Sequence, residues 1–144
     1  MRIAIGCDHR GLTLKQAIIR SLSAEGHQFD DAGTNDTASV DYPDIAVKVG
    51  RAVASGVAVY GILICGTGIG MCIAANKMKG IRAVNCSDSF CAERGRAHNN
   101  ANVLCLGGEI LDDTAALEIV KTFLSTEFLG GRHQRRVEKL DRIE

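Results

Sequence analysis

The chain alternates short, unbroken apolar runs with longer segments whose apolar residues recur every three or four positions. Unbroken runs such as Gly61-Ile62-Leu63-Ile64-Cys65 are typical of parallel strands buried on both faces, whereas the longer segments are typical of amphipathic helices. The pattern predicts strands at 2–7, 28–31, 60–65, 81–85 and 102–106, and helices at 12–24, 44–54, 70–79, 88–98, 112–124 and 132–143. This order of elements predicts a parallel sheet with helices on both faces.

The length and composition suit one domain. The chain has 144 residues, of which 46% are hydrophobic and 24% charged, far from the low hydrophobicity of disordered chains. No linker or low-complexity tract interrupts the pattern, although 34–43 is a longer polar segment predicted to be a loop. The expected fold class is α/β: a single three-layer Rossmann-like domain spanning 1–144, with a five-stranded parallel sheet and a C-terminal helix.

The charge balance argues against nucleic acid as a partner. Lys and Arg together number 17, as do Asp and Glu, and aromatic residues make up only 4% of the chain. Neither a basic groove nor a base-stacking platform is expected. The first apolar run breaks at Cys7-Asp8-His9, too early for a signal-peptide core, and no segment approaches transmembrane length. We therefore expect a cytoplasmic protein with no membrane partner.

The six cysteines do not have the spacing of a metal site. They stand at positions 7, 65, 72, 86, 91 and 105 and include no Cys-x-x-Cys pair, so structural zinc is not expected. A disulfide framework has little support without an export signal. No His-x-His pair, Glu-x-x-His pair or carboxylate cluster is evident. We expect no metal and no cofactor, and interpret most of the thiols as small buried hydrophobic groups.

The segment Cys65-Gly66-Thr67-Gly68-Ile69-Gly70 ends a predicted strand and opens a predicted helix. Its glycines allow a tight turn that exposes backbone N–H groups to an anion. No Gly-Lys-Ser/Thr follows, as a Walker A loop requires, and Met71 replaces both the third glycine of a dinucleotide loop and the Arg of a cysteine phosphatase loop. What remains is a thiol beside a helix N-terminus, suited to taking a proton from carbon. Taken alone, the segment is better explained as a compact structural turn.

Three further segments offer groups suited to a sugar phosphate. Asp8-His9 pairs a hydrogen-bond acceptor with an imidazole. His98-Asn99 offers an imidazole able to protonate a ring oxygen and an amide able to hold a hydroxyl. Arg132 and Arg136 share a predicted helix face, from which two guanidinium groups can clamp a phosphate. Each segment also has an ordinary explanation, as a helix cap, a polar helix end or a solvated basic face.

Together these groups favour the interconversion of an aldose and a ketose. That reaction proceeds by a hydride shift, which requires a metal, or through an enediol, which requires a base, an oxyanion holder and a ring-opening acid. Cys65, the glycine-rich loop and His98 are candidates for the three enediol roles. The enediol route is therefore the better fit to this sequence.

The chain closely resembles the ribose-5-phosphate isomerase B family, which also includes allose-6-phosphate and galactose-6-phosphate isomerases. The resemblance is nearly full length and lies in Gly6-Cys7-Asp8-His9, Asp41-Tyr42-Pro43, Gly61 to Gly70, Ala74-Ala75-Asn76-Lys77, Gly80-Ile81-Arg82-Ala83, His98-Asn99 and Gly130-Gly131-Arg132-His133. It implies metal-free interconversion of D-ribose 5-phosphate and D-ribulose 5-phosphate through an enediolate.

The resemblance also implies roles for individual residues. Cys65 would move the proton between C1 and C2, and Thr67 would polarise the thiol or the substrate. His98 would open the furanose ring with help from Asp8. Substrate contacts are implied for Asp8, His9, Tyr42, Gly66, Thr67, Gly68, Ile69, Gly70, Asn99, Arg132 and Arg136. The site is implied to be shared between the subunits of a homodimer, which some members pair into tetramers.

One position departs from the family's pattern. Where many members carry Gly-x-Arg after the fifth strand, this sequence has Gly107-Gly108-Glu109, which replaces a potential phosphate-binding cation with a carboxylate expected to repel phosphate. Ribose 5-phosphate is the leading substrate. A six-carbon substrate, such as allose 6-phosphate or galactose 6-phosphate, is the first alternative. A non-catalytic protein that binds a sugar phosphate or a nucleotide is the second.

Overall fold

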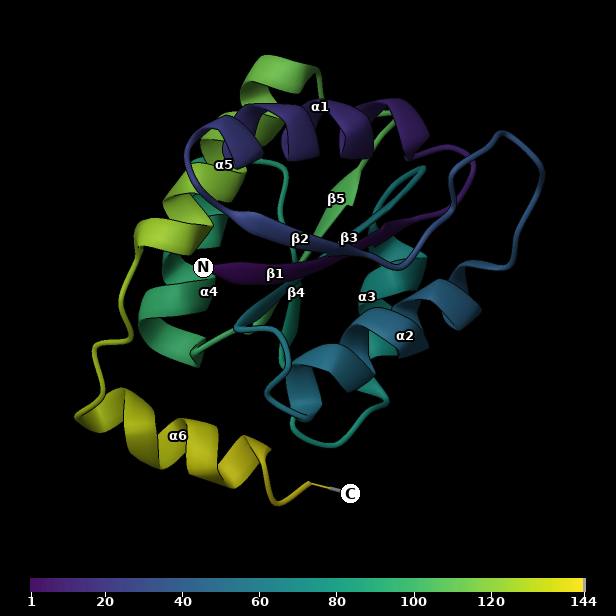
Figure 1. Ribbon diagram of the computed structural model, residues 1–144. Coiled ribbons are helices and arrows are strands. Elements are labelled where there is room, and N and C mark those ends of the chain that lie inside the picture. The colour runs from purple at the N-terminus through teal and green to yellow at the C-terminus, as the bar shows by residue number, and fades with distance from the viewer. Residues whose placement is uncertain (144) are drawn as a thin grey trace.

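The computed structural model describes residues 1–143 and contains one parallel sheet between two layers of helices (Figure 1). The strands are β1 (Arg2–Cys7), β2 (Gln28–Asp31), β3 (Tyr60–Cys65), β4 (Ala83–Asn85) and β5 (Val103–Gly107). They lie in the order β2-β1-β3-β5-β4, and each pairing is parallel. The predicted α/β class, Rossmann-like layering and five-stranded parallel sheet are confirmed.

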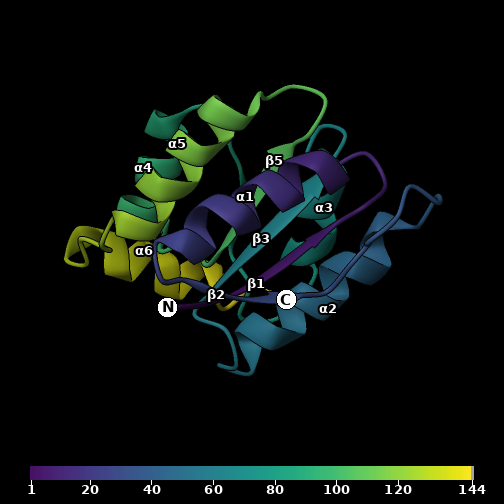
Figure 2. The same ribbon diagram turned by 45° about the horizontal axis from the view of Figure 1, so that its top comes forward.

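Helices cover both faces of the sheet (Figure 2). They are α1 (Leu12–Ala24), α2 (Tyr42–Ala54), α3 (Ile69–Asn76), α4 (Ser89–Asn99), α5 (Asp113–Ser125) and α6 (Arg132–Leu140). On one face, α1, α4 and α5 bury Ile18, Ala92 and Phe123 against the strands. On the other face, α2 and α3 bury Val49 and Met71. Helix α6 is the expected C-terminal helix and lies beside α4, outside the three layers (Figure 1).

The sheet order brings the ends of β1 and β3 together. These strands pair in parallel, and the backbone N–H of Asp8 donates to the carbonyl of Ile64 at 3.1 Å. The chain leaves β1 towards α1 on one face and leaves β3 towards α3 on the other. Two diverging connections at the carboxyl edge of a parallel sheet create the place where such folds bind ligands.

Some predicted boundaries differ from the observed ones. Helix α2 begins at Tyr42, inside the predicted polar loop, because Pro43 is tolerated in the first helical turn. Helix α3 ends early, at Asn76, and β4 begins late, at Ala83. The Asn76 side chain bonds both the N–H and the carbonyl of Ala83, at 2.8 and 2.9 Å, so residues 77–82 form a turn. Helix α6 ends at Leu140 rather than at position 143.

A buried lysine attaches the segment after β2 to α1. The Lys15 side chain is 1% exposed, and its ammonium group donates to both carboxylate oxygens of Asp31 at 2.7 and 2.8 Å. It also donates to the Thr34 carbonyl at 2.6 Å and to Asn35 Oδ1 at 2.9 Å. Because this segment leads directly to Tyr42, the same contact restrains the chain that approaches the carboxyl edge of the sheet.

Removing this ammonium group is expected to destabilise the fold. Lys15→Ala removes a buried ammonium group together with its hydrogen bonds to Asp31, Thr34 and Asn35, and the loss of such a network costs about 3 kcal/mol of unfolding free energy. Urea unfolding followed by circular dichroism measures it. Lys121→Ala is the matched control, since its exposed pair with Glu25 at 2.6 Å contributes about 0.5 kcal/mol. Equal losses in the two variants would contradict the structural role of Lys15.

Candidate active site

The Cys65 thiol lies at the start of the connection from β3 to α3. Its side chain is 6% exposed, and its sulfur accepts a hydrogen bond from the Gly68 N–H at 3.1 Å. Gly68 has a φ of +80°, and a Cβ there would lie 2.9 Å from the backbone carbon of Leu106. A glycine is therefore required for the turn that aims this N–H at the sulfur. The thiol faces the N-terminal end of α3, where the helix presents its unpaired donors.

Two further glycines let other segments approach the same loop. A Cβ on Gly70 would lie 2.8 Å from the ring of Tyr42, and one on Gly66 would lie 2.8 Å from Glu109 Oε2. Tyr42 therefore lies against the first turn of α3, and Glu109 lies against the residue that follows Cys65. The Tyr42 side chain stays partly exposed, so it borders the loop without closing it.

The predicted pair Asp8-His9 lies at the same edge of the sheet. Asp8 is buried, and its Oδ1 accepts the backbone N–H of Arg10 at 2.9 Å. The His9 Nδ1 accepts the N–H of Val40 at 3.4 Å, which assigns the ring proton of the neutral form to Nε2. The structure thus brings Asp8, His9 and Tyr42 together with the loop from Cys65 to Gly70.

The other predicted site residues lie at the opposite edge of the sheet. Helix α4 runs back from the carboxyl edge, so His98 and Asn99 lie beside the start of β5. Figure 1 shows α6, with Arg132 and Arg136, against α4 and away from α3. A strand as long as β3 spans roughly 20 Å. Within one chain, the structure does not bring these residues to Cys65.

The residues at that opposite edge form a positively charged cluster. The rings of His98 and His133 stack with centroids 4.2 Å apart and planes 8° from parallel. The guanidinium of Arg94 lies 3.3 Å from His98 Nε2. With Arg132 and Arg136 on the adjoining turn of α6, the cluster has the charge and the donors to bind an anion. We name these five residues the amino-edge cluster.

Comparison with known proteins identifies the family. Residues 3–140 match the family model described as Ribose/Galactose Isomerase. The chain belongs to the ribose/galactose isomerase family. The resemblance expected from the sequence is therefore confirmed over almost the whole chain.

Relatives in this family match the chain over nearly its full length. Ribose-5-phosphate isomerase B of Escherichia coli K12 is 47% identical over 143 residues, 99% of this chain and 96% of the relative. The solved ribose-5-phosphate isomerase B of Clostridium thermocellum has a TM-score of 0.97 and 50% identity, covering 98% of this chain and 95% of its own. The solved ribose-5-phosphate isomerase B of Mycoplasma genitalium, with bound ribulose-5-phosphate, has a TM-score of 0.94 and 45% identity. The match covers 98% of this chain and 94% of its own.

Sequence patterns missed one side chain at the site of this isomerase-family protein. The guanidinium of Arg10 forms an ion pair with Glu109, with Nη1 and Oε1 2.9 Å apart. The Glu109 carboxylate, expected from the sequence to repel phosphate, therefore has a neighbouring cation that the sequence analysis did not identify. The two residues stand 99 positions apart, and nothing in either local pattern couples them. The sequence offered one signal for this pair: Arg10 follows β1, Glu109 follows β5, and these two strands lie on either side of β3.

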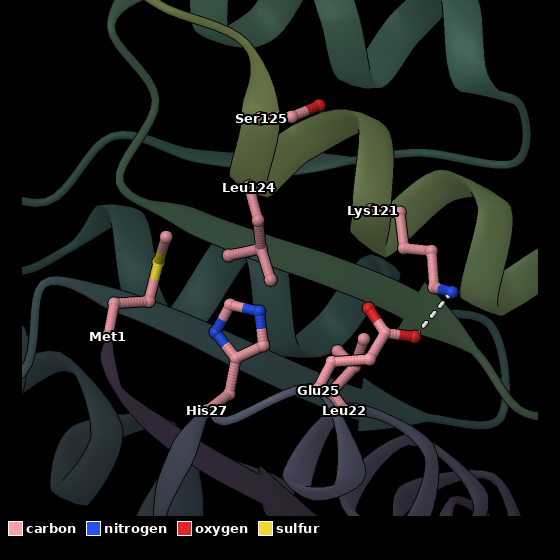
Figure 3. Close-up of a pocket in the computed structure, with 7 residues that line it drawn as sticks. All are labelled: Met1, Leu22, Glu25, His27, Lys121, Leu124 and Ser125. Atoms are coloured by element: carbon pink, nitrogen blue, oxygen red, sulfur yellow. Dashed lines mark ion pairs between the residues drawn. The ribbon is translucent and has the colours of Figure 1, made fainter.

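Two surface cavities differ in their relation to this site. A cavity of about 150 Å³ adjoins the loop and is lined by Thr67, Ile69, Asn85, Cys86, Ser87, Gly107, Ile110 and Leu111. The larger one, about 320 Å³, lies between the ends of α1 and α5 and is lined by Met1, Leu22, Glu25, His27, Lys121, Leu124 and Ser125 (Figure 3). It is wide open, and its charged groups are already paired with each other. We assign the site to the loop, where donors and titratable groups converge.

The cysteines other than Cys65 show what burial does to a thiol. Burial raises the pKa of Cys7 to about 11 and that of Cys86 to about 12, as expected for thiols that act as small hydrophobic groups. A hydrogen bond with Cys105 lowers the pKa of Cys72. Cys7, Cys86 and Cys105 are buried as expected, Cys72 is partly buried, and Cys91 is exposed.

The described chain contains neither a candidate metal site nor a helix suited to cross a membrane. Across residues 1–143, no three His, Cys, Asp or Glu side chains gather into a group that could hold a metal ion. In the same residues, no helix has the length and apolarity needed to cross a membrane.

The amino-edge cluster makes stability depend on pH. Burial lowers the pKa of His133 below the ordinary value, and the charges of His98, Arg132 and Arg136 lower it further. Below about pH 6.5 the unfolded state therefore holds more protons at this position than the folded state, and stability falls as pH falls. We expect His133→Gln to lose less unfolding free energy than the wild type between about pH 8 and about pH 5.5.

Urea unfolding at each pH measures this difference. His27→Gln, outside the cluster, is the control and should keep the pH dependence of the wild type. An unchanged pH dependence in His133→Gln would show that the cluster does not hold this imidazole neutral.

Proposed function

We propose that this chain interconverts D-ribose 5-phosphate and D-ribulose 5-phosphate through an enediolate, with Cys65 as the residue that moves the proton. The observation that carries the proposal is the placement of this thiol at a glycine-rich helix N-terminus, hydrogen-bonded by the Gly68 N–H. The relative from Mycoplasma genitalium was solved with ribulose-5-phosphate, the ketose of this reaction. All six cysteines are free thiols, which suits a reducing compartment such as the cytoplasm.

The reaction begins by opening the sugar ring. His98 donates a proton to the ring oxygen, while Asp8 accepts the proton of the C1 hydroxyl, so that the C1–O bond to the ring breaks and a carbonyl forms at C1. Tyr42, His9 and Asn99 hold the sugar hydroxyls and the phosphate. Arg132 and Arg136 supply the main positive charge for the phosphate.

The second stage moves a proton between two carbons. The Cys65 thiolate takes the proton from C2, the C–H electron pair forms the C1–C2 double bond, and O1 becomes an oxyanion. We propose that the backbone of the loop from Gly66 to Gly70, which leads into the N-terminal end of α3, holds that oxyanion through N–H groups. After a proton moves from O2 to O1, the thiol returns its proton to C1 and O2 becomes the new carbonyl oxygen.

Thr67 supports the thiol in this scheme. Its Oγ1 accepts the N–H of Ile69 at 3.3 Å, which leaves its hydroxyl proton to be donated. In the proposed scheme this hydroxyl donates either to the thiolate or to the substrate carbonyl. No metal and no cofactor takes part in any of these steps.

The site needs two copies of the chain. His98 and Cys65 lie at opposite edges of one sheet, farther apart than a five-carbon sugar phosphate can reach. In a symmetric dimer each carboxyl-edge loop faces the partner's amino-edge cluster, which completes two equivalent sites. The outer face of α3 supports such a contact, since Ile69 and Ile73 are 54% and 59% exposed. Such dimers can pair further into tetramers without changing the site.

Loss of the thiol is expected to abolish most turnover. Cys65→Ala should lower kcat by about 10²–10⁴ while KM changes little, since the proton carrier is removed and the binding groups stay. The wild type should remain active in EDTA. The assay follows ribulose 5-phosphate formed from ribose 5-phosphate, with Cys91→Ala as a control for loss of an exposed thiol. Undiminished kcat in Cys65→Ala would refute the mechanism, and faster turnover of allose 6-phosphate would reassign the substrate.

Mixing two inactive variants tests whether the site is shared. Cys65→Ala and His98→Asn each damage both sites of their own homodimer. In a mixed dimer one site is intact and the other carries both changes, so an equal mixture should regain roughly one quarter of wild-type activity after subunit exchange. Each variant mixed with itself is the control. No recovery, with subunit exchange verified by native mass measurement, would contradict a site built from two chains.

A further inference from the structure

The ion pair between Arg10 and Glu109 lies directly on the glycine-rich loop. A Cβ on Gly66 would be 2.8 Å from Glu109 Oε2 and 3.2 Å from Arg10 Cδ, so both side chains cross the residue next to Cys65. A Cβ on Gly108 would lie 2.7 Å from the carbonyl oxygen of Arg10. Two glycines thus make room for the connections after β1 and β5 to meet over this loop.

Both residues are fixed through their backbone. The N–H of Arg10 donates to the Asp8 carboxylate at 2.9 Å. The N–H of Glu109 donates to the Gly66 carbonyl at 3.0 Å, and that of Gly108 donates to the Cys65 carbonyl at 2.8 Å. The pair is therefore anchored to the segments that carry the proposed base and ring-opening group.

Stability does not explain this pair. The side chains of Arg10 and Glu109 are 56% and 51% exposed, and ion pairs this exposed contribute only about 0–1 kcal/mol. The buried Lys15 provides the contrast, because its ammonium group is fully used by Asp31, Thr34 and Asn35. Lys15 has no donor left for a ligand, whereas the guanidinium of Arg10 has five donors and uses one of them on Glu109.

We propose that Arg10 binds the phosphate of the substrate from the carboxyl edge, and that Glu109 is a positioning residue that orients its guanidinium. This inference rests on the proposed function and adds a specificity residue to it. The pair engages Nη1 of Arg10, and the Arg10 side chain stays 56% exposed. The planar fork of a guanidinium matches two oxygens of a phosphate monoester. Glu109 alone would repel that dianion. Paired with Arg10, it holds the cation in place.

The first test compares KM with kcat. Arg10→Ala should raise KM for ribose 5-phosphate about tenfold, the equivalent of one charge-assisted hydrogen bond, and should leave kcat within about threefold. The same variant should weaken competitive inhibition by inorganic phosphate. Turnover of unphosphorylated D-ribose, assayed at high sugar concentration, should be the same in the variant and the wild type. Arg10→Lys, which keeps the charge but loses the fork, should fall between the wild type and Arg10→Ala.

A double variant tests the role of Glu109. In Arg10→Ala the Glu109 carboxylate faces the phosphate without compensation, so adding Glu109→Gln should recover part of the lost affinity. Glu109→Gln alone should raise KM less than Arg10→Ala, because the cation remains. Lys121→Ala, which breaks an ion pair of similar exposure elsewhere, is the control and should keep wild-type KM.

The outcomes separate this inference from the proposed function. If the wild type does not turn over ribose 5-phosphate, the proposed function fails. If the wild type is active and Arg10→Ala keeps its KM, or loses ribose and ribose 5-phosphate turnover equally, the phosphate contact is overturned. If the double variant is no better than Arg10→Ala, the positioning role of Glu109 is overturned. Thermal unfolding of each variant shows that the measured proteins are folded.

Discussion

The direction of the strands is the constraint on which the site depends. Because all five strands run in parallel, their carboxyl ends lie at one edge, and the segments that follow β1, β3 and β5 meet there. That edge collects Asp8, Cys65 and Glu109 from three distant parts of the sequence. The helices that return the chain to the next strand must end at the other edge, which is where α4 delivers His98. The residues of the proposed site are therefore divided into two half-sites, one at each edge of the same sheet.

Close backbone approach makes the carboxyl-edge half-site possible. The sulfur of Cys65 lies 3.1 Å from the Gly68 nitrogen only because residue 68 has a positive φ and no Cβ. Missing Cβ atoms at Gly66 and Gly70 admit Glu109 and the Tyr42 ring. A side chain at residue 66 or 70 would displace Glu109 or Tyr42, and one at residue 68 would collide with the backbone of Leu106. The glycines therefore matter mainly because they lack a Cβ and so allow neighbouring segments to approach the loop closely. Their backbone flexibility is a second contribution.

The sequence was sufficient for the fold class and for the approximate strand positions, because apolar periodicity is a local signal, and strand-end motifs supplied the candidate residues that the proposed function uses. It was not sufficient for features that need distant partners. The early end of α3 depends on Asn76 bonding Ala83, and the environment of Glu109 depends on Arg10. The separation of His98 from Cys65 follows from strand direction, and so it was predictable once the parallel sheet was accepted.

The two half-sites also differ in charge. This difference couples the binding of a phosphorylated substrate to the association of two chains. At the carboxyl edge, Arg10 is balanced by Glu109, and Asp8 adds a negative charge. The amino-edge cluster instead gathers Arg132, Arg136 and their neighbours, whose like charges repel one another. Burial and these charges together lower the pKa of His133. A phosphate dianion between the two edges relieves that repulsion, while the paired Arg10 adds attraction without raising the net charge of its own edge. Substrate binding and association of the chains should therefore strengthen each other.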